Sequence, residues 1–201
     1  MERIVIISIH QPEHFPYEGF FQKMKKTDLF VILDNVKYRK NYFQNRNRFP
    51  DKKNKDQWFT IPVESSANSK LIKDVSVSKD PNWRKKIVKK ILHNFNEDTT
   101  DIYSSDSLLE INLKSIKWCM DRLELRTPIV LASKLGVSGQ NSSLLLDICK
   151  KTKAKKYISG PSGKDYLDLS LFENIEVEFF QPKVKNYYSM LYNIRKGEIN
   201  V

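Results

Sequence analysis

The first residues whose types and spacing could support chemistry are two histidines. His10 and His14 follow an apolar run at residues 3–9. A spacing of four would place both rings on one face of a helix and suggest a metal site, but Pro12 and Pro16 exclude a helix here. We therefore predict no metal. A histidine at this place can donate to a phosphate, stabilise developing charge or act as a general base. The alternative is a structural pair that hydrogen-bonds loop carbonyls.

A carboxylate and an arginine form the second candidate set. Asp34 ends the apolar run 29–33, where an isolated charge would be costly. We expect its partner to be Lys40, Arg46 or a ligand hydroxyl. Arg46 lies between two amides in Asn45-Arg46-Asn47. A guanidinium suits phosphate and the amides suit sugar or base edges, although an asparagine-rich turn would look the same.

Two further segments contain residues that favour close approach to a ligand. Gln11 offers an amide on a backbone fixed by the following proline, and Gly19 could admit a ligand or only pack a helix against a sheet. The run at 159–164 reads Ser159-Gly160-Pro161-Ser162-Gly163-Lys164. It lacks the spacing of a phosphate-binding P-loop, because Asp follows Lys164. It is still predicted to be a glycine-rich turn whose N–H groups could face an anion.

The elements that must position these residues alternate along the chain. Apolar, β-branched runs predict strands, and amphipathic runs predict helices. The predicted strands are 3–9, 29–33, 128–131, 156–159 and 175–180, and the predicted helices are 17–26, 81–95, 107–123 and 142–151. Alternation of this kind predicts an α/β fold with a mainly parallel sheet of about five strands.

The middle segment, residues 35–80, is predicted to be an addition to the parallel sheet. Residues 35–56 are predicted to be a long loop, and 58–63 and 72–77 to be strands of a small β extension. We predict one domain over residues 1–201, Rossmann-like or nucleotidylyltransferase-like, in which 35–80 is a loop or β insertion. Ligands of such sheets bind beyond the carboxyl ends of the strands, where the polar residues named above gather. The polar residues that follow the predicted strands therefore predict a ligand site at the carboxyl ends of those strands.

Charge indicates what the ligand could carry. The 201 residues include 35 Lys and Arg against 24 Asp and Glu, a net charge of +11. The excess gathers in three segments, of which only 37–56 interleaves its cations with aromatic and amide side chains such as Tyr38. Basic segments attract phosphates on nucleotides, nucleic acid or anionic lipid. The other two, 84–90 and 150–156, are typical of solvated helix faces.

Composition limits the cellular setting. The longest apolar runs fall far short of the ~20 residues that a membrane span needs. No secretory signal is evident, and the two cysteines, Cys119 and Cys149, are too few for a disulfide framework and are expected in the core. We expect a cytoplasmic protein with no membrane partner, and a homo-oligomer is left open.

Several motifs together resemble the WbqC-like family. They are Ile9-His10-Gln11-Pro12-Glu13-His14-Phe15-Pro16-Tyr17-Glu18-Gly19-Phe20-Phe21, the strand 28–38, Asn45-Arg46-Asn47, the segments 135–139 and 157–167, and the tail 188–193. The resemblance covers nearly the whole chain. Departures are His14, Tyr17 and Phe43 where the family has other aromatic residues, and a missing Asp in the tail.

The resemblance implies an enzyme of surface-polysaccharide (O-antigen) sugar biosynthesis. Such an enzyme would transfer an acyl or aminoacyl group, for example glycyl, to the amine of a nucleotide-linked amino sugar. The donor is unknown, and ATP with Mg²⁺ or an aminoacyl-tRNA would both suit the charge. A nucleotidylyltransferase-like enzyme acting on a small phosphorylated substrate, and a non-catalytic nucleic-acid-binding protein, remain the alternatives.

Each candidate residue receives a role in this interpretation. His10, His14 and Asp34 are the predicted catalytic residues. The predicted substrate-binding residues are Gln11, Tyr17, Gly19, Tyr38, Lys40, Asn45, Arg46, Asn47, Ser159, Gly160 and Lys164.

Overall fold

The computed structural model describes residues 5–201, and these form two compact units that are each discontinuous in sequence. The sheet unit comprises Met1–Gln11, Gly19–Asp34 and Arg126–Lys183, of which residues 1–4 lie outside the described part. The ribbon unit comprises Pro12–Glu18, Asn35–Leu125 and Val184–Val201. The chain therefore passes from one unit to the other several times.

The sheet unit contains five parallel strands. In spatial order they are β5 (Ile129–Leu131), β2 (Leu29–Ile32), β1 (Ile6–His10), β6 (Lys156–Ser159) and β7 (Glu176–Phe179). β1 and β2 are largely buried, as their near-continuous apolar sequences require. The predicted α/β fold with a five-stranded parallel sheet is confirmed, although the predicted start of the first strand falls partly on residues outside the described part.

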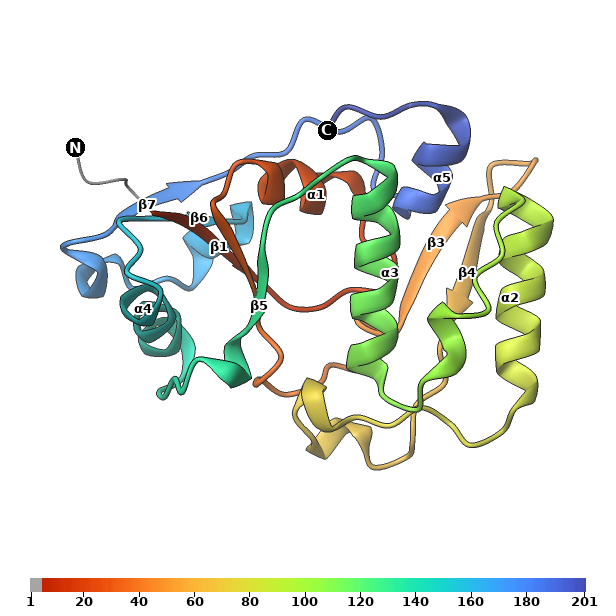
Figure 1. Cartoon of the computed structure of the whole chain (residues 1–201), viewed down its shortest axis with the longest axis horizontal. Helices are drawn as coiled ribbons and strands as arrows, with labels where there is room; N and C mark the ends of the chain where they lie inside the picture. Colours follow the sequence, from red (N-terminus) through yellow and green to blue (C-terminus); the bar gives the residue numbers. More distant parts are fainter. Residues whose placement is uncertain (1–4) are drawn as a thin grey trace. The chain divides into compact units, whose positions relative to one another are not determined.

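Two helices cover this sheet. α1 (Glu18–Lys25) connects β1 to β2, and α4 (Asn141–Lys151) connects β5 to β6. The chain moves outward from β1 through β2 to β5 and then returns to the other side of β1, so the two connections run in opposite directions. Right-handed crossovers then place the two helices on opposite faces, as Figure 1 shows. The strand order reverses between β1 and β6, and this switch point is where open α/β sheets bind ligands.

The ribbon unit is built on an antiparallel hairpin. β3 (Arg46–Pro50) pairs with β4 (Asp56–Thr60), and the helices α2 (Asn82–Phe95), α3 (Leu108–Arg122) and α5 (Met190–Lys196) lie around them (Figure 1). The hairpin turn is closed by Asp51, whose Oδ1 accepts from the backbone N–H groups of Lys53 (2.8 Å) and Lys55 (2.9 Å). This is the local bonding that makes Asp a turn residue.

Local signals explain where the long helices begin. Asp80 Oδ1 accepts from the backbone N–H of Asn82 at 2.9 Å at the start of α2, and Ser107 Oγ accepts from the N–H of Glu110 at 3.4 Å at the start of α3. Both bonds satisfy donors that a helix start leaves without partners. The predicted helices over 81–95, 107–123 and 142–151 are confirmed. None of the helices in the described part of the chain combines the length and apolar character that crossing a bilayer requires.

The middle segment differs from its prediction. Residues 35–56 are not one loop, because they contain β3. The predicted strand 72–77 is wrong as well: it opens with a short 3₁₀ turn, Ile72–Asp74, and pairs only through isolated bridges, one of them between Val77 and Val63. Ile72, Val75 and Val77 are buried as they would be in a strand. The hydrophobic pattern alone therefore could not distinguish a strand from this 3₁₀ turn with isolated bridges.

Candidate functional site

The carboxyl edge of the sheet unit begins at His10, the last residue of β1. Its Nδ1 lies 2.9 Å from the carbonyl oxygen of Gln11. A carbonyl only accepts, so Nδ1 carries the proton and Nε2 carries the lone pair. Burial, followed by the nearby Lys23 ammonium, lowers the pKa of His10 to about 3, against a smaller opposing effect of the Gln11 bond. His10 is therefore neutral at physiological pH, with Nε2 able to accept a proton.

Lys23 is a residue that the sequence analysis did not select. It lies on α1 with its side chain 4% exposed, and its Nζ donates to the Ile9 carbonyl at 3.5 Å and lies 5.9 Å from the centre of the Phe30 ring. A buried ammonium beside the end of β1 places positive charge where phosphate or a developing oxyanion would be stabilised. The signal in the sequence was a lysine three residues after Phe20, on the apolar face of its helix.

Asp34 follows β2 and is fully buried. The expected partners Lys40 and Arg46 are wrong, because Asp34 bonds Ser133 instead, whereas the expected ligand hydroxyl stays a prediction. Asp34 Oδ1 accepts from the backbone N–H of Ser133 at 2.9 Å, and its Oδ2 accepts from Ser133 Oγ at 2.6 Å. Ser133 follows β5, the neighbour of β2, so the pair joins two adjacent strand ends. Asp34 therefore holds the ends of β2 and β5 in place relative to each other.

β6 contributes the other side of the switch point. Ser8 Oγ of β1 donates to the Ile158 carbonyl at 2.7 Å, which holds the two strands together beneath their ends. Ser159 is 1% exposed, and its Oγ has no hydrogen-bond partner among residues 5–201. A Cβ at Gly163 would meet that oxygen at 2.2 Å, whereas a Cβ at Gly160 would meet open space. The segment after β6 thus approaches Ser159 closely and leaves room above Gly160.

The remaining predicted residues of the sheet unit lie near these strand ends in sequence. Gln11 directly follows β1, and Gly19 is buried in the first turn of α1. Lys164 is exposed after β6, with its Nζ 5.8 Å from the centre of the Phe179 ring. The sheet unit therefore brings His10, Ser159 and Gly160 to the two strands of the switch point, while Asp34 belongs to the β2–β5 side.

His14 lies in the ribbon unit and is fully enclosed. Its Nε2 is 2.9 Å from the hydroxyl of Tyr103, and its ring meets those of Phe15 and Phe59 edge-on at 5.2 and 5.1 Å. Burial lowers the pKa of His14 to about 3. These are the contacts of a core residue, so this placement favours the structural interpretation of His14 over the catalytic one.

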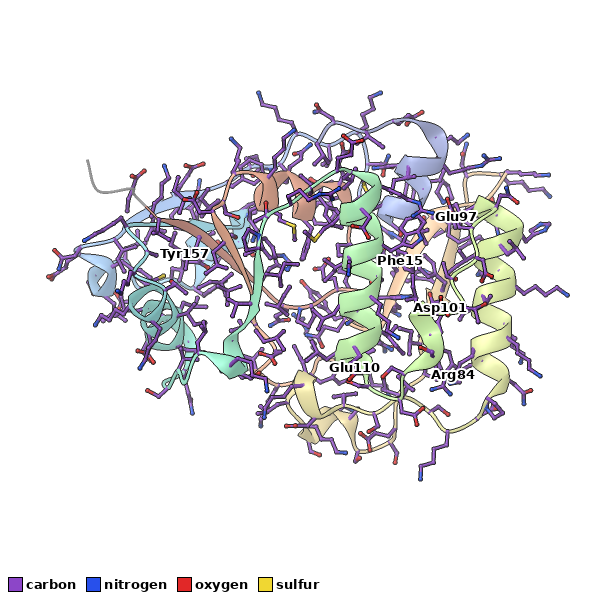
Figure 2. All side chains as sticks on the ribbon, in the orientation of Figure 1. Phe15, Arg84, Glu97, Asp101, Glu110 and Tyr157 are labelled. Atoms are coloured by element: carbon purple, nitrogen blue, oxygen red, sulfur yellow. The ribbon has the colours of Figure 1, made fainter. Side chains whose placement is uncertain are left out.

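The two asparagines of Asn45-Arg46-Asn47 hold backbone. Asn47 Nδ2 donates to the carbonyls of His14 (3.1 Å) and Phe15 (2.7 Å), and its Oδ1 accepts from the N–H of Arg48 (2.8 Å). Phe15, labelled in Figure 2, has a φ of 45°, a backbone conformation that is costly for a bulky residue. The hydrogen bonds from Asn47 help to hold the backbone in that conformation. Asn45 Nδ2 donates to the Ile61 carbonyl at 2.9 Å. Both amide nitrogens are thus committed to the fold.

Arg46 contributes a buried donor without a partner, whereas its neighbour Asn45 leaves only an acceptor, Oδ1, without one among residues 5–201. Its guanidinium stacks over Trp58 at 4.3 Å, and within residues 5–201 its buried Nε has no hydrogen-bond partner. The Tyr38 hydroxyl is likewise buried without a partner among those residues. Burial raises the pKa of Tyr38, with Arg46 opposing that rise, so the phenol keeps its proton and the two groups lie within electrostatic range. Two buried donors that lack acceptors suit an oxyanion such as phosphate.

Two predicted binding residues of the ribbon unit lie nearer the solvent. Lys40 is exposed, and Tyr17 is partly buried with its ring centre 5.6 Å from that of Tyr187. No group of three or more His, Cys, Asp or Glu side chains that could hold a metal occurs within residues 5–201.

Comparison with known proteins shows which family this chain belongs to. It is 24% identical over 184 residues to Rv1507c of Mycobacterium tuberculosis, a protein described as uncharacterized, and the match covers 85% of this chain and 79% of that protein. No solved structure matches the chain. The family model for the WbqC-like proteins matches residues 11–193, which include Gln11 and the Asn45-Arg46-Asn47 motif. The chain belongs to the WbqC-like protein family.

Proposed function

We propose that this chain is an enzyme that transfers an acyl or aminoacyl group to the amine of a nucleotide-linked sugar, as in the synthesis of surface polysaccharides such as O-antigen. The observation that carries the proposal is His10, a neutral imidazole with a fixed tautomer at the switch point of a parallel sheet. Membership of the WbqC-like family supports it.

The proposed reaction needs a group that accepts one proton. The sugar amine attacks the acyl carbon of an activated donor, and a C–N bond forms as the donor's leaving group departs with the electrons of the broken bond. The attacking nitrogen must lose a proton, and His10 Nε2 is the acceptor in this proposal. A pKa of about 3 keeps Nε2 unprotonated from pH 5 to 8, but it also makes the imidazole a weak base. The proposal therefore requires the bound anionic substrate to raise the pKa of His10 towards neutrality.

Within the ribbon unit, a phosphate-binding role is assigned to the buried donors. Arg46 and Tyr38 would hold a phosphate, because each buries an N–H or O–H that lacks an acceptor among residues 5–201. The asparagines beside Arg46 would then act indirectly, by fixing the strand that carries it.

Transfer itself can be measured by mass spectrometry. The protein is incubated with dTDP- or UDP-linked 4-amino sugars and either glycine with ATP and Mg²⁺ or glycyl-tRNA, and the sugar product is examined for added glycyl mass. We expect product with one of the two donors. His10→Ala should reduce its rate by about 100-fold to 10,000-fold, the usual effect of a general base.

Arg46→Ala provides the second arm, and it should act mainly on KM, because it removes a phosphate contact. Leu92→Ala serves as the control, since Leu92 is 48% exposed on α2. Absence of product with either donor, or full activity of both His10→Ala and Arg46→Ala, would exclude the proposal.

A further inference from the structure

Three tyrosines of the ribbon unit form a surface cluster that the proposed reaction leaves without a role. We call Tyr17, Tyr42 and Tyr187 the tyrosine cluster. The ring centres of Tyr17 and Tyr187 lie 5.6 Å apart with planes inclined by 35°. Tyr187 is 57% exposed and Tyr42 is 38% exposed. Exposed aromatic rings around a half-buried one offer flat apolar surface that a ligand ring can cover.

The backbone that presents Tyr187 is firmly held. Asn186 Oδ1 accepts from the N–H of Tyr188 at 2.9 Å, and Asn186 Nδ2 donates to Asn193 Oδ1 at 3.1 Å. The N–H of Ser189 donates to the Arg48 carbonyl at 2.9 Å, which ties the segment to β3. Tyr187 is therefore an exposed ring on a fixed support, and stacking against it would cost little conformational entropy.

Charge around the tyrosine cluster is uneven. The guanidinium of Arg39 lies over the ring of Tyr42 at 4.8 Å. The opposite charge lies near Tyr17, where Glu13 is 6% exposed. Burial, then Glu13, then the other two tyrosines raise the pKa of the Tyr17 hydroxyl, so these groups lie within electrostatic range of one another and the phenol stays protonated. A carboxylate repels phosphate, so the surroundings of Tyr17 suit an uncharged ring and those of Arg39 suit an anion.

We propose that the tyrosine cluster stacks against the base of a nucleotide, with Arg39 beside its phosphates. The inference rests on the proposed function in taking a nucleotide-linked substrate, and it names the part of that substrate which this cluster binds. A sugar ring could also cover a tyrosine, but the cation beside Tyr42 and the carboxylate near Tyr17 match the division of a nucleotide into anionic and uncharged parts.

Binding measurements with and without a base test the inference. The probes are UDP and dTDP, which carry a base, and inorganic pyrophosphate, which does not, each titrated calorimetrically. Loss of one base–aromatic stack weakens binding by about 10-fold to 100-fold. We expect that loss for Tyr187→Ala with both nucleotides, and an unchanged Kd for pyrophosphate. Tyr187→Phe and Tyr187→Trp should bind nucleotides as the wild type does, because both keep an aromatic face.

Controls separate stacking from a general defect. Leu92→Ala removes an exposed apolar side chain of the same unit and should change neither Kd. Arg39→Ala should weaken nucleotides and pyrophosphate alike. Equal weakening of pyrophosphate and nucleotides by Tyr187→Ala would overturn the inference, as would unchanged nucleotide binding or failure of the wild type to bind either nucleotide.

Failure of the inference is distinguishable from failure of the proposed function. Nucleotide binding that depends on Tyr187, with no glycyl transfer from any donor, would uphold the stacking site and exclude the reaction. Glycyl transfer whose KM for the nucleotide sugar is unchanged in Tyr187→Ala would uphold the reaction and overturn the stacking site.

Discussion

Asn45, Arg46 and Asn47 are adjacent in sequence but have separate physical roles. The asparagine amides hold the Ile61 and Phe15 carbonyls, whereas Arg46 stacks on Trp58 and keeps its Nε without a hydrogen-bond partner among residues 5–201. Buried donors without acceptors are uncommon in folded proteins, which makes Arg46 the member of the motif most suited to a ligand. The motif thus places one free donor between two asparagines that hold backbone, of which Asn45 also keeps its Oδ1 without a partner among residues 5–201.

Ser133→Ala tests the role of Asp34 at the same scale. The substitution removes the hydroxyl that donates to the buried Asp34 carboxylate at 2.6 Å. A hydrogen bond to a charged group contributes about 1.5–3 kcal/mol, so the free energy of unfolding measured in urea should fall by about that amount. Ser65→Ala, at an exposed serine, should change it by less than about 0.5 kcal/mol. Equal values for Ser133→Ala and the wild type would show that other contacts satisfy Asp34.

At the scale of elements, apolar content decided what could be predicted. β1, β2 and β6 are buried in a parallel sheet and are rich in β-branched or aromatic residues, so their sequences predict strands. β3 reads Arg-Asn-Arg-Phe-Pro, and its buried positions are Asn47 and Phe49. Asn47 is buried because it hydrogen-bonds the backbone of a distant segment. A hydropathy pattern cannot predict burial of a polar residue for that reason. α5 was not predicted either, since the tail entered only as a family motif.

Site residues followed the same division. The strands were predicted, so His10 and Ser159 lie at strand ends as expected and Asp34 lies two residues after β2, while their roles in a site stay predictions. Partners were not predictable, because Ser133 is 99 residues from Asp34 in sequence and meets it only through the pairing of β2 with β5. The effect of Lys23, whose ammonium lowers the pKa of His10, was not predictable without knowing that this lysine on an apolar helix face is buried.

The turn after β6 yields a prediction for this element. A Cβ on Gly163 would lie 2.2 Å from Ser159 Oγ and 3.1 Å from the Phe179 ring. Overpacking of this kind costs about 1–3 kcal/mol, so Gly163→Ala should lower the unfolding midpoint in urea by a corresponding amount. The double variant Ser159→Ala/Gly163→Ala removes the nearest clashing atom and should recover most of the loss. An additive double variant would show that Ser159 is not the obstacle.

At the scale of the whole molecule, the positive charge is explained only in part. In the ribbon unit a depression of about 750 Å³ is lined by Lys52, Lys53, Arg195 and Lys196, among others. Arg195 and Lys196 lie in the last turn of α5, where cations stabilise the negative end of a helix. Helix electrostatics therefore accounts for part of this basic surface, and nucleic-acid binding stays an untested prediction.

Stability against pH also belongs to the whole molecule, and His14 gives it a direction. Its pKa is lowered by burial from 6.5 to about 3 in the folded state. The unfolded chain therefore binds a proton first as the pH falls, and stability is lost below about pH 6.5 until the folded value near 3 is reached. Between pH 6 and pH 5, His14 alone should reduce the free energy of unfolding by about 1 kcal/mol.

His10 acts in the same direction, because its pKa is also lowered to about 3. The carboxylates whose pKa is lowered act at lower pH. Bonds from Lys70 and Ser76 lower the pKa of Glu64 to about 2, so its contribution to stability is lost as the pH falls below its ordinary value of 4.5. Hydrogen bonds lower the pKa of Asp51 and of Asp98, whose ordinary value is 3.8, as well.

Urea titrations at pH 7, 6 and 5 should show His14→Gln losing less stability over this range than the wild type. His93→Gln, at an exposed histidine of α2, should follow the wild type. If the loss in His14→Gln equals that of the wild type, then His14 takes up its proton without unfolding, and the enclosed aromatic setting must open at mild acidity.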